Sequence, residues 1–314
     1  MVWTASPLER GPLLTLSSDT IAELEVPRSG VEPLADKMPL PRSIDPDEHD
    51  DMICFVAETA VRRLLNRIHS ALYGPDSGGS LDFPDDDLGP YDAGTLNKQL
   101  AVSSELNRQL EEWYGSIPGK LRPPIGTESV ASRRGKVLRI RYYTARQIIH
   151  RPFVLAVAVE HKRLSARSSP GPSTAPPVPT ISRVILEKCE ACIASCTAYL
   201  CNVIEILERR SLYLWGFSQG CVACLVVLLL ADSCPQLRPF TPDVKQLQTM
   251  IVKALRRWAT PGSSFEAEVK IVENLNLLER FEQQRRQQQR LSFYDTDPLS
   301  ALRELGGRGS RGGP

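Results

Sequence analysis

Residues 212–232, LYLWGFSQGCVACLVVLLLAD, form the most apolar stretch of this chain, and the fold depends on what this stretch becomes. A helix that is hydrophobic on all sides is buried, either in a protein core or in a membrane. A membrane span needs about twenty mainly apolar residues, and this stretch just reaches that length. Ser218 and Gln219 interrupt it, however, and its densest part, residues 221–231, is too short to span. We therefore predict a helix that other helices cover.

The same stretch offers a candidate catalytic motif, the sequence GFSQG at residues 216–220. It matches the G-x-S-x-G elbow of α/β-hydrolases, where a serine lies on a sharp turn between a strand and a helix and is followed along the chain by the acid and the histidine. Strand-like alternation is scarce elsewhere in this chain. A hydrolase using Ser218 therefore stays an alternative, and no catalytic residue is assigned, because every histidine precedes this serine: His49, His69, His150 and His161.

The composition favours a globular protein of helices separated by irregular connections. The chain has 314 residues, 42% of them hydrophobic, and its 25 prolines fall mostly between the periodic segments. A net charge of +1 gives no overall attraction to nucleic acid or to an acidic membrane. The first residues, MVWTASPLERG, lack the basic and apolar regions of a secretory signal. We therefore expect the eight cysteines to be reduced thiols in an intracellular compartment.

Apolar residues recur at intervals of three and four in several further segments, the pattern of amphipathic helices. The predicted fold class is therefore all-α. Pro152 should kink or split one of these helices near His150, because proline has no backbone N–H to donate. The predicted helices cover residues 53–73, 95–114, 133–159, 181–209, 244–259 and 265 to about 290.

The expected organisation is a single multi-helix domain with irregular ends. Segments rich in Pro, Gly, Ser and charge cannot bury enough apolar area to become ordered. In the irregular N-terminal segment, Ser17–Asp19 is able to cap only a short helix. The expected parts are residues 1–50 as this irregular segment, residues 51–290 as the helical domain, disordered insertions near 74–93 and 165–180, and a disordered tail at 291–314.

Three groups of residues suggest metal binding, and none meets its requirements. The pairs Cys189/Cys192 and Cys221/Cys224 have C-x-x-C spacing, but both lie inside apolar helical patterns, whereas zinc ribbons place such pairs on short knuckles. We interpret these cysteines as small thiols that pack between helices. The acidic run at residues 85–87 is better explained as a solvated loop. His150 and His161 are better explained as packing or surface residues. We assign no metal and no cofactor.

The basic clusters are short and favour no nucleic-acid site. Single-strand binding combines a basic groove with aromatic residues on which bases stack, and no such interleaving occurs here. We interpret the clusters as solvated helix faces: Arg62–Arg63, Arg133–Arg134, Arg256–Arg257 and Arg285–Arg286.

Several blocks of the chain resemble one family, the fungal zinc-cluster transcription factors, in their regulatory middle region. The more distinctive blocks are AETAVRRLLNRIHSALY at 57–73 and LRIRYYTARQIIHRPFV at 138–154. The remaining blocks are more generic, and together the set covers most of the chain between residues 22 and 278. These are AELEVPRSGVEPLADKMPLP at 22–41, LNRQLEEWYGSIPGKLRP at 106–123, CEACIASCTAYL at 189–200 and LWGFSQGCVACLVVLLLADS at 214–233.

This resemblance implies an all-helical regulatory domain of a nuclear transcription factor, acting through contacts with other transcription factors or a co-regulator. A helical surface such as residues 266–290 would serve for docking. The family's DNA-binding module uses six cysteines, in triplets spaced C-x2-C-x6-C. Here that spacing would require cysteine at Tyr199 and Ala231, and residues 1–53 contain none.

DNA binding is therefore not carried over to this chain, and we expect no catalysis. The chain would be either a naturally short regulator or part of a longer one. A helical scaffold unrelated to transcription remains a further alternative.

Overall fold

The computed structural model describes residues 49–74, 93–126, 128–167 and 181–275. Helices make up 79% of this described part and it contains no strand, so the all-α prediction is confirmed. The chain divides into two units, residues 1–269 and 270–314. Of the second unit only residues 270–275 are described, and they are helical.

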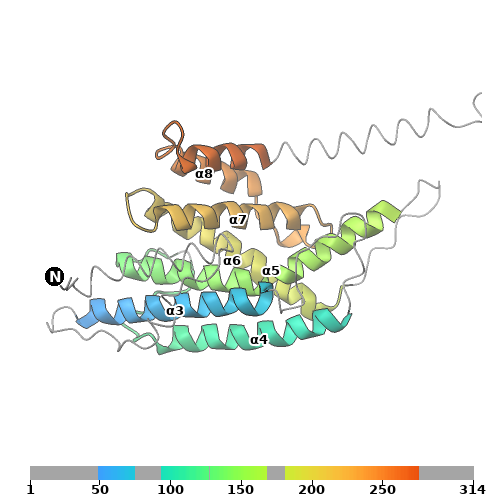
Figure 1. The fold of residues 1–314 in the computed structure, drawn as a ribbon, viewed down its shortest axis with the longest axis horizontal. Helices are drawn as coiled ribbons and strands as arrows, with labels where there is room; N and C mark the ends of the chain where they lie inside the picture. The colour runs from blue at the N-terminus through green and yellow to red at the C-terminus, as the bar shows by residue number, and fades with distance from the viewer. Residues whose placement is uncertain (1–48, 75–92, 127, 168–180, 276–314) are drawn as a thin grey trace, which may run out of the picture. The chain divides into compact units, whose positions relative to one another are not determined.

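The helices of the first unit follow one another along the chain (Figure 1). Residues 264–269 are also helical and end this unit. The named elements are α3 (His49–Tyr73), α4 (Ala93–Ser116), α5 (Arg133–Arg167), α6 (Arg183–Leu207), α7 (Leu214–Asp232), the 3-10 helix η3 (Arg238–Phe240) and α8 (Val244–Leu255).

Helix α5 is the centre of this unit. It packs against α3, α4, α6 and α7, and its contact with α6 is the most extensive between two of the named helices. Helix α6 adds contacts with α7 and α8, and α7 itself lies against α5, α6 and α8. The core is therefore formed where α5, α6 and α7 meet, with α3 and α4 on one side of α5 and α8 on the other side of α7 (Figure 1).

Helix α3 begins at His49, four residues before the predicted start at residue 53. Asp50 and Asp51 lie in its first turn, where a negative charge stabilises the positive end of the helix dipole. Both carboxylates also form ion pairs with residues of other segments. Asp50 pairs with Lys120 at 2.6 Å, and Asp51 pairs with Arg134 at 2.9 Å. These contacts extend the helix beyond its apolar pattern.

Helix α5 continues through Pro152 to Arg167, so of the two predicted outcomes, a kink or a split near His150, the split does not occur. The proline leaves the carbonyl of Ile148 without its usual backbone donor four residues later. The hydroxyl of Tyr73, from α3, donates to that carbonyl at 2.9 Å instead. The helix changes direction part-way along its length (Figure 1), as a proline kink predicts. A contact from a distant helix therefore compensates the lost hydrogen bond.

Helices α6 and α8 have polar caps at their N-termini, whereas α7 has none. Ser182 accepts from the backbone of Ile185, and Asp243 accepts from that of Gln246. At the other end, α8 stops at Leu255, earlier than the predicted residue 259. The chain then turns so that the indole N–H of Trp258 donates to the carbonyl of Leu207 at 2.7 Å, which ties this turn to the end of α6.

The apolar stretch forms α7 and is a buried helix, as predicted. Phe217, Leu225 and Leu228 have at most 1% of their surface exposed. By length and composition alone, both α6 and α7 could cross a membrane, yet more than half of the apolar window of each is buried within the protein. Val226 on the outer side of α7 is 43% exposed.

Some predicted features lie outside the described residues. These are the short helix after Ser17, the acidic run at 85–87, most of both insertions, the basic pair Arg285–Arg286 and the tail at 291–314.

Candidate functional site

The GFSQG segment lies wholly inside α7, where no strand precedes the serine. Ser218 is completely buried, and its hydroxyl donates to the carbonyl of Trp215 at 2.7 Å, within its own helix. A nucleophile elbow needs an exposed serine on a turn between a strand and a helix. The geometry at Ser218 is that of a packing residue.

Gly220, in the same segment, lets α7 approach α6 closely. A Cβ atom at this position would lie 2.2 Å from the hydroxyl oxygen of Tyr199, on α6, and 2.7 Å from its ring carbon Cζ. That hydroxyl donates to the carbonyl of Phe217 at 2.8 Å, and the rings of Tyr199 and Phe217 meet edge to face. The glycine therefore makes room for an aromatic contact that locks the two helices together.

Gln219 connects α7 to the helical residues 264–269. Its side-chain amide donates to the Glu268 carboxyl at 2.6 Å, and Glu268 is only 3% exposed. Burial raises the pKa of Glu268, although the neighbouring side chains of Ser218 and Gln219 oppose that change. Each of the three inner residues of the motif thus has a packing role.

The cysteines of the two C-x-x-C pairs are free thiols in the core, as predicted. Cys189, Cys192, Cys221 and Cys224 have no exposed surface. Burial raises the pKa of Cys189 to about 12. The structure also brings Cys196 of α6 within hydrogen-bonding reach of both Cys192 and Cys224, which the sequence pattern does not predict across helices.

Arg151 lies beside this group of thiols. Its guanidinium donates to the side-chain oxygen of Gln147, and the Cys192 thiol donates to the Gln147 backbone carbonyl at 3.4 Å. Hydrogen bonds with Cys192 and Cys224, together with the positive charge of Arg151, hold the pKa of Cys196 well below its usual value. Within the described residues, no group of three or more potential ligands has the geometry to hold a metal ion.

His150 is a packing residue, which is one of the two roles, packing or surface, that the sequence predicts for it. It is 3% exposed, with Ser103 Oγ lying 3.4 Å from Nδ1 and Asn107 Oδ1 lying 3.3 Å from Nε2. These partners suit the neutral ring with its proton on Nε2. Burial, followed by the charges of Lys188 and Arg146, lowers the pKa of His150 to about 3.

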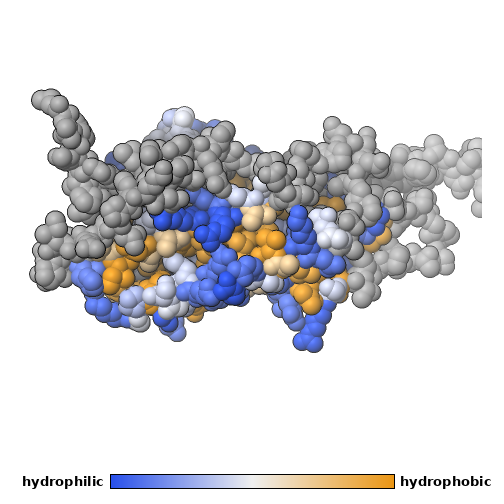
Figure 2. Space-filling model, turned by 60° about the horizontal axis from the view of Figure 1, so that its bottom comes forward, coloured by the Kyte–Doolittle hydropathy of each residue, from blue (hydrophilic) through white to orange (hydrophobic). Residues whose placement is uncertain are grey.

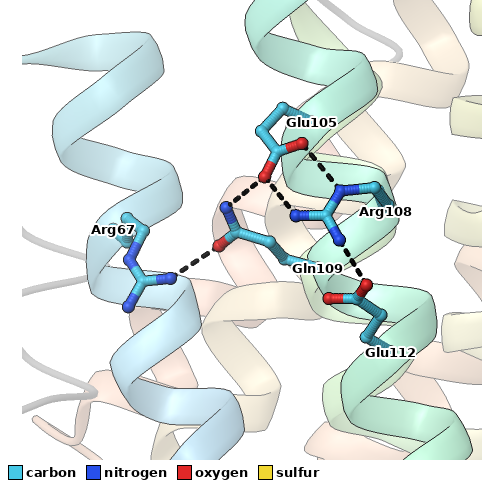
Figure 3. A network of polar contacts seen from close by, with 5 residues as sticks. All are labelled: Arg67, Glu105, Arg108, Gln109 and Glu112. Carbon is cyan, nitrogen blue, oxygen red and sulfur yellow. Dashed lines mark hydrogen bonds and ion pairs between the residues drawn. The ribbon is translucent and has the colours of Figure 1, made fainter.

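The α3–α4 surface carries a network of exposed polar side chains (Figure 3). Arg108 forms ion pairs with Glu105 at 2.6 Å and with Glu112. Gln109 donates to Glu105 at 2.9 Å and accepts from Arg67 of α3 at 2.6 Å. Exposed ion pairs of this kind contribute little to stability. The network is therefore not needed to hold α3 and α4 together.

Figure 2 turns the α3–α4 side forward. Hydrophilic residues occupy much of its middle, with apolar patches between them. A mixed surface of this kind is as apolar as ordinary protein exteriors, so its hydrophobicity alone does not mark an interface.

Comparisons with known proteins give one informative match. Over 172 residues, which are 52% of this chain, the sequence is 26% identical to an Aspergillus rugulosus protein named "Putative transcription factor ecdB". The chain is similar to a transcription factor. It spans only 25% of the length of that protein. No family model matches the chain, and no solved structure matches it.

Proposed function

We propose that this chain is the regulatory region of a transcription regulator of the fungal zinc-cluster type. In this proposal it works in the nucleus, through contacts with other transcription factors or a co-regulator, and carries out no catalytic step. The observation that carries the proposal is the similarity to the Aspergillus rugulosus protein over about half of the chain.

The positions of the resembling blocks support this assignment. The blocks at 57–73, 106–123 and 138–154 fall on α3, on α4 with the residues that follow it, and on α5. Those three helices contact one another. The resemblance therefore covers a continuous part of the folded unit, which is expected when a domain rather than an isolated motif is shared.

The proposal assigns the contacts to exposed helical surfaces. The α3–α4 surface with Arg108 and Glu112 is one candidate (Figure 3). The segment 266–290 is the other, since Ala267, Lys270 and Glu273 in its described part, residues 266–275, are exposed.

Binding of the purified chain to a full-length zinc-cluster factor tests this proposal. We expect a stable complex of the two purified proteins, weakened either by a truncation after Leu275 or by reversal of the charges at Arg108 and Glu112. Absence of binding to any such factor, by a chain with native helical content, would contradict it.

The proposal also predicts that the chain alone does not recognise DNA. Non-specific affinity for DNA depends on phosphate contacts from basic side chains, and the net charge of this chain is only +1. We expect no sequence-specific shift of promoter DNA at physiological salt and no stoichiometric zinc. A salt-resistant footprint, or two zinc ions per chain by elemental analysis, would overturn this part.

A further inference from the structure

Two half-buried cations near the centre of the first unit have side chains that make neither a hydrogen bond nor an ion pair with the described residues. They are Arg146 of α5 and Lys188 of α6. The Nε atom of Arg146 is inaccessible to solvent and has no hydrogen-bond acceptor. By contrast, Arg108 on the surface of α4 has two carboxylates (Figure 3). A polar atom withdrawn from water is normally hydrogen-bonded, so the Arg146 Nε–H is an open donor beside a second unpaired cation.

The packing of α5 against α6 places both cations beside the same ring. Lys136 pairs with Glu205, and Gln147 contacts Cys192, so the two helices run antiparallel. Lys188 is one helical turn before Cys192 and therefore lies level with the residues that follow Gln147, including His150. Arg146 is one turn before His150 on α5. The cations approach His150 from two helices, and the charges of both lower the pKa of this histidine, after the larger effect of burial.

Helix α4 forms the third side of the region around His150, Arg146 and Lys188. Ser103 and Asn107 hold His150 in its neutral form, so the ring supplies no negative charge. On α4, Glu111 accepts the hydroxyl of Tyr142 at 2.7 Å, and within the described residues it forms no ion pair with either cation. On α6, Glu187 pairs with Arg183, and Glu190 lies beside Cys189. Arg151 faces the thiols of Cys192, Cys196 and Cys224 instead.

We propose that Arg146 and Lys188 bind a small anion through carboxylate or phosphate oxygens, at the junction of α4, α5 and α6. A guanidinium offers parallel donors that fit two oxygens of such a group, and an ammonium adds a compact charge. Two cations without a carboxylate favour a ligand with two negative charges. This site does not depend on the proposed role in transcription.

Thermal unfolding of the full chain in a buffer free of polyvalent anions tests the site. We expect inorganic phosphate or succinate to raise the melting temperature in a saturable way, beyond sodium chloride of equal ionic strength. The response to the two probes separates a phosphate ligand from a dicarboxylate. Absence of a saturable rise with either probe would overturn the proposal.

Variants of the two cations test whether the anion binds between them. Arg146→Gln and Lys188→Gln should each weaken binding about tenfold or more, which corresponds to about 1.4 kcal/mol, and the double variant should abolish it. Arg183→Gln is the control, because this arginine lies on the same helix with its side chain 91% exposed. An unchanged affinity in the double variant would contradict the assignment.

A second measurement needs only the wild-type chain and so does not depend on the folding of any variant. Both cations flank His150, so its ring signals in an NMR titration should shift as phosphate or succinate saturates the protein. Ring signals that stay constant at saturation would exclude this location.

Discussion

Helices α7 and α8 are neighbours in the chain and in space, yet their sequences are organised differently. In α8 the buried positions are mainly apolar, and the exposed ones are mainly polar, among them Lys245, Gln246, Thr249 and Lys253. In α7 the outer face is also apolar, with Val222, Val226 and Leu229 there, and Gln219 is its one amide. The pattern of α8 therefore reveals its inner face, whereas that of α7 does not.

The difference follows from the number of neighbours. Helix α7 packs against α5, α6 and α8, so most of its circumference needs apolar residues. Helix α8 packs only against α6 and α7 among the named helices, and its other side faces solvent. Sequence shows that α7 is buried, and only the structure shows which of its residues are buried most.

The largest expected effect is that of a charge placed in α7. Leu228 is completely buried, so Leu228→Asp places an unpaired charge in the core. It should lower the free energy of unfolding by about 3–5 kcal/mol. The matched change in α8, Thr249→Asp, affects an exposed residue and should cost about 0.5 kcal/mol. Chemical denaturation of both variants measures the contrast. A Leu228→Asp protein that unfolds cooperatively at the wild-type midpoint would contradict the burial of α7.

The next effect concerns the close contact of α7 with α6, for which α8 has no counterpart. Gly220→Ala should destabilise the protein by about 1–3 kcal/mol, because the added methyl group overlaps Tyr199. In the Tyr199→Phe background the same change should cost less, since the closest atom is gone. Gly115→Ala on α4 is the control, because its new methyl group would meet nothing within 4 Å. Additive costs in the double variant would show that the overlap with the Tyr199 hydroxyl is not the cause.

A smaller difference in stability is expected from the N-termini of the two helices, because α8 has a side-chain cap there and α7 has none. Asp243→Ala removes the cap of α8 and should cost about 1 kcal/mol. Asp243→Asn keeps an acceptor oxygen and should cost clearly less. At the start of α7, Tyr213 makes no side-chain cap, so this helix depends on packing alone. Equal losses from the alanine and asparagine variants, in thermal unfolding, would show that the cap is not the cause.

The smallest expected effect is at Ser218. Its hydroxyl bonds within its own helix, and alanine is a better helix former, so Ser218→Ala should change stability by less than about 0.5 kcal/mol. A serine-directed probe should not label the wild-type chain. Labelling that disappears in the alanine variant would revive the hydrolase alternative.

The sequence predicts those features that depend on one segment. Periodicity located the helices, and the uniform apolar character of residues 221–231 predicted that α7 is buried. Features that need a partner from elsewhere were not predictable. The continuity of α5 through Pro152 depends on Tyr73, which is 79 positions earlier in the chain. The role of Gly220 depends likewise on the place of Tyr199.

The candidate site follows the same rule. The sequence argued against a zinc ribbon at the C-x-x-C pairs, because both pairs fall in helical patterns, and the structure places both on helices. It could not reveal that Arg146 and Lys188 approach His150 without a carboxylate, because pairing of charges is decided by which helices pack together.

A reporter assay tests the central claim, a regulatory role in transcription, most directly. The chain is fused to an unrelated DNA-binding domain and compared with that domain alone at a reporter gene. We predict a change in reporter expression that persists in Ser218→Ala and is lost in Leu228→Asp, since the effect requires the folded helical unit and no catalytic serine. Reporter expression equal to that of the DNA-binding domain alone, with the fusion folded and present in the nucleus, would contradict the account.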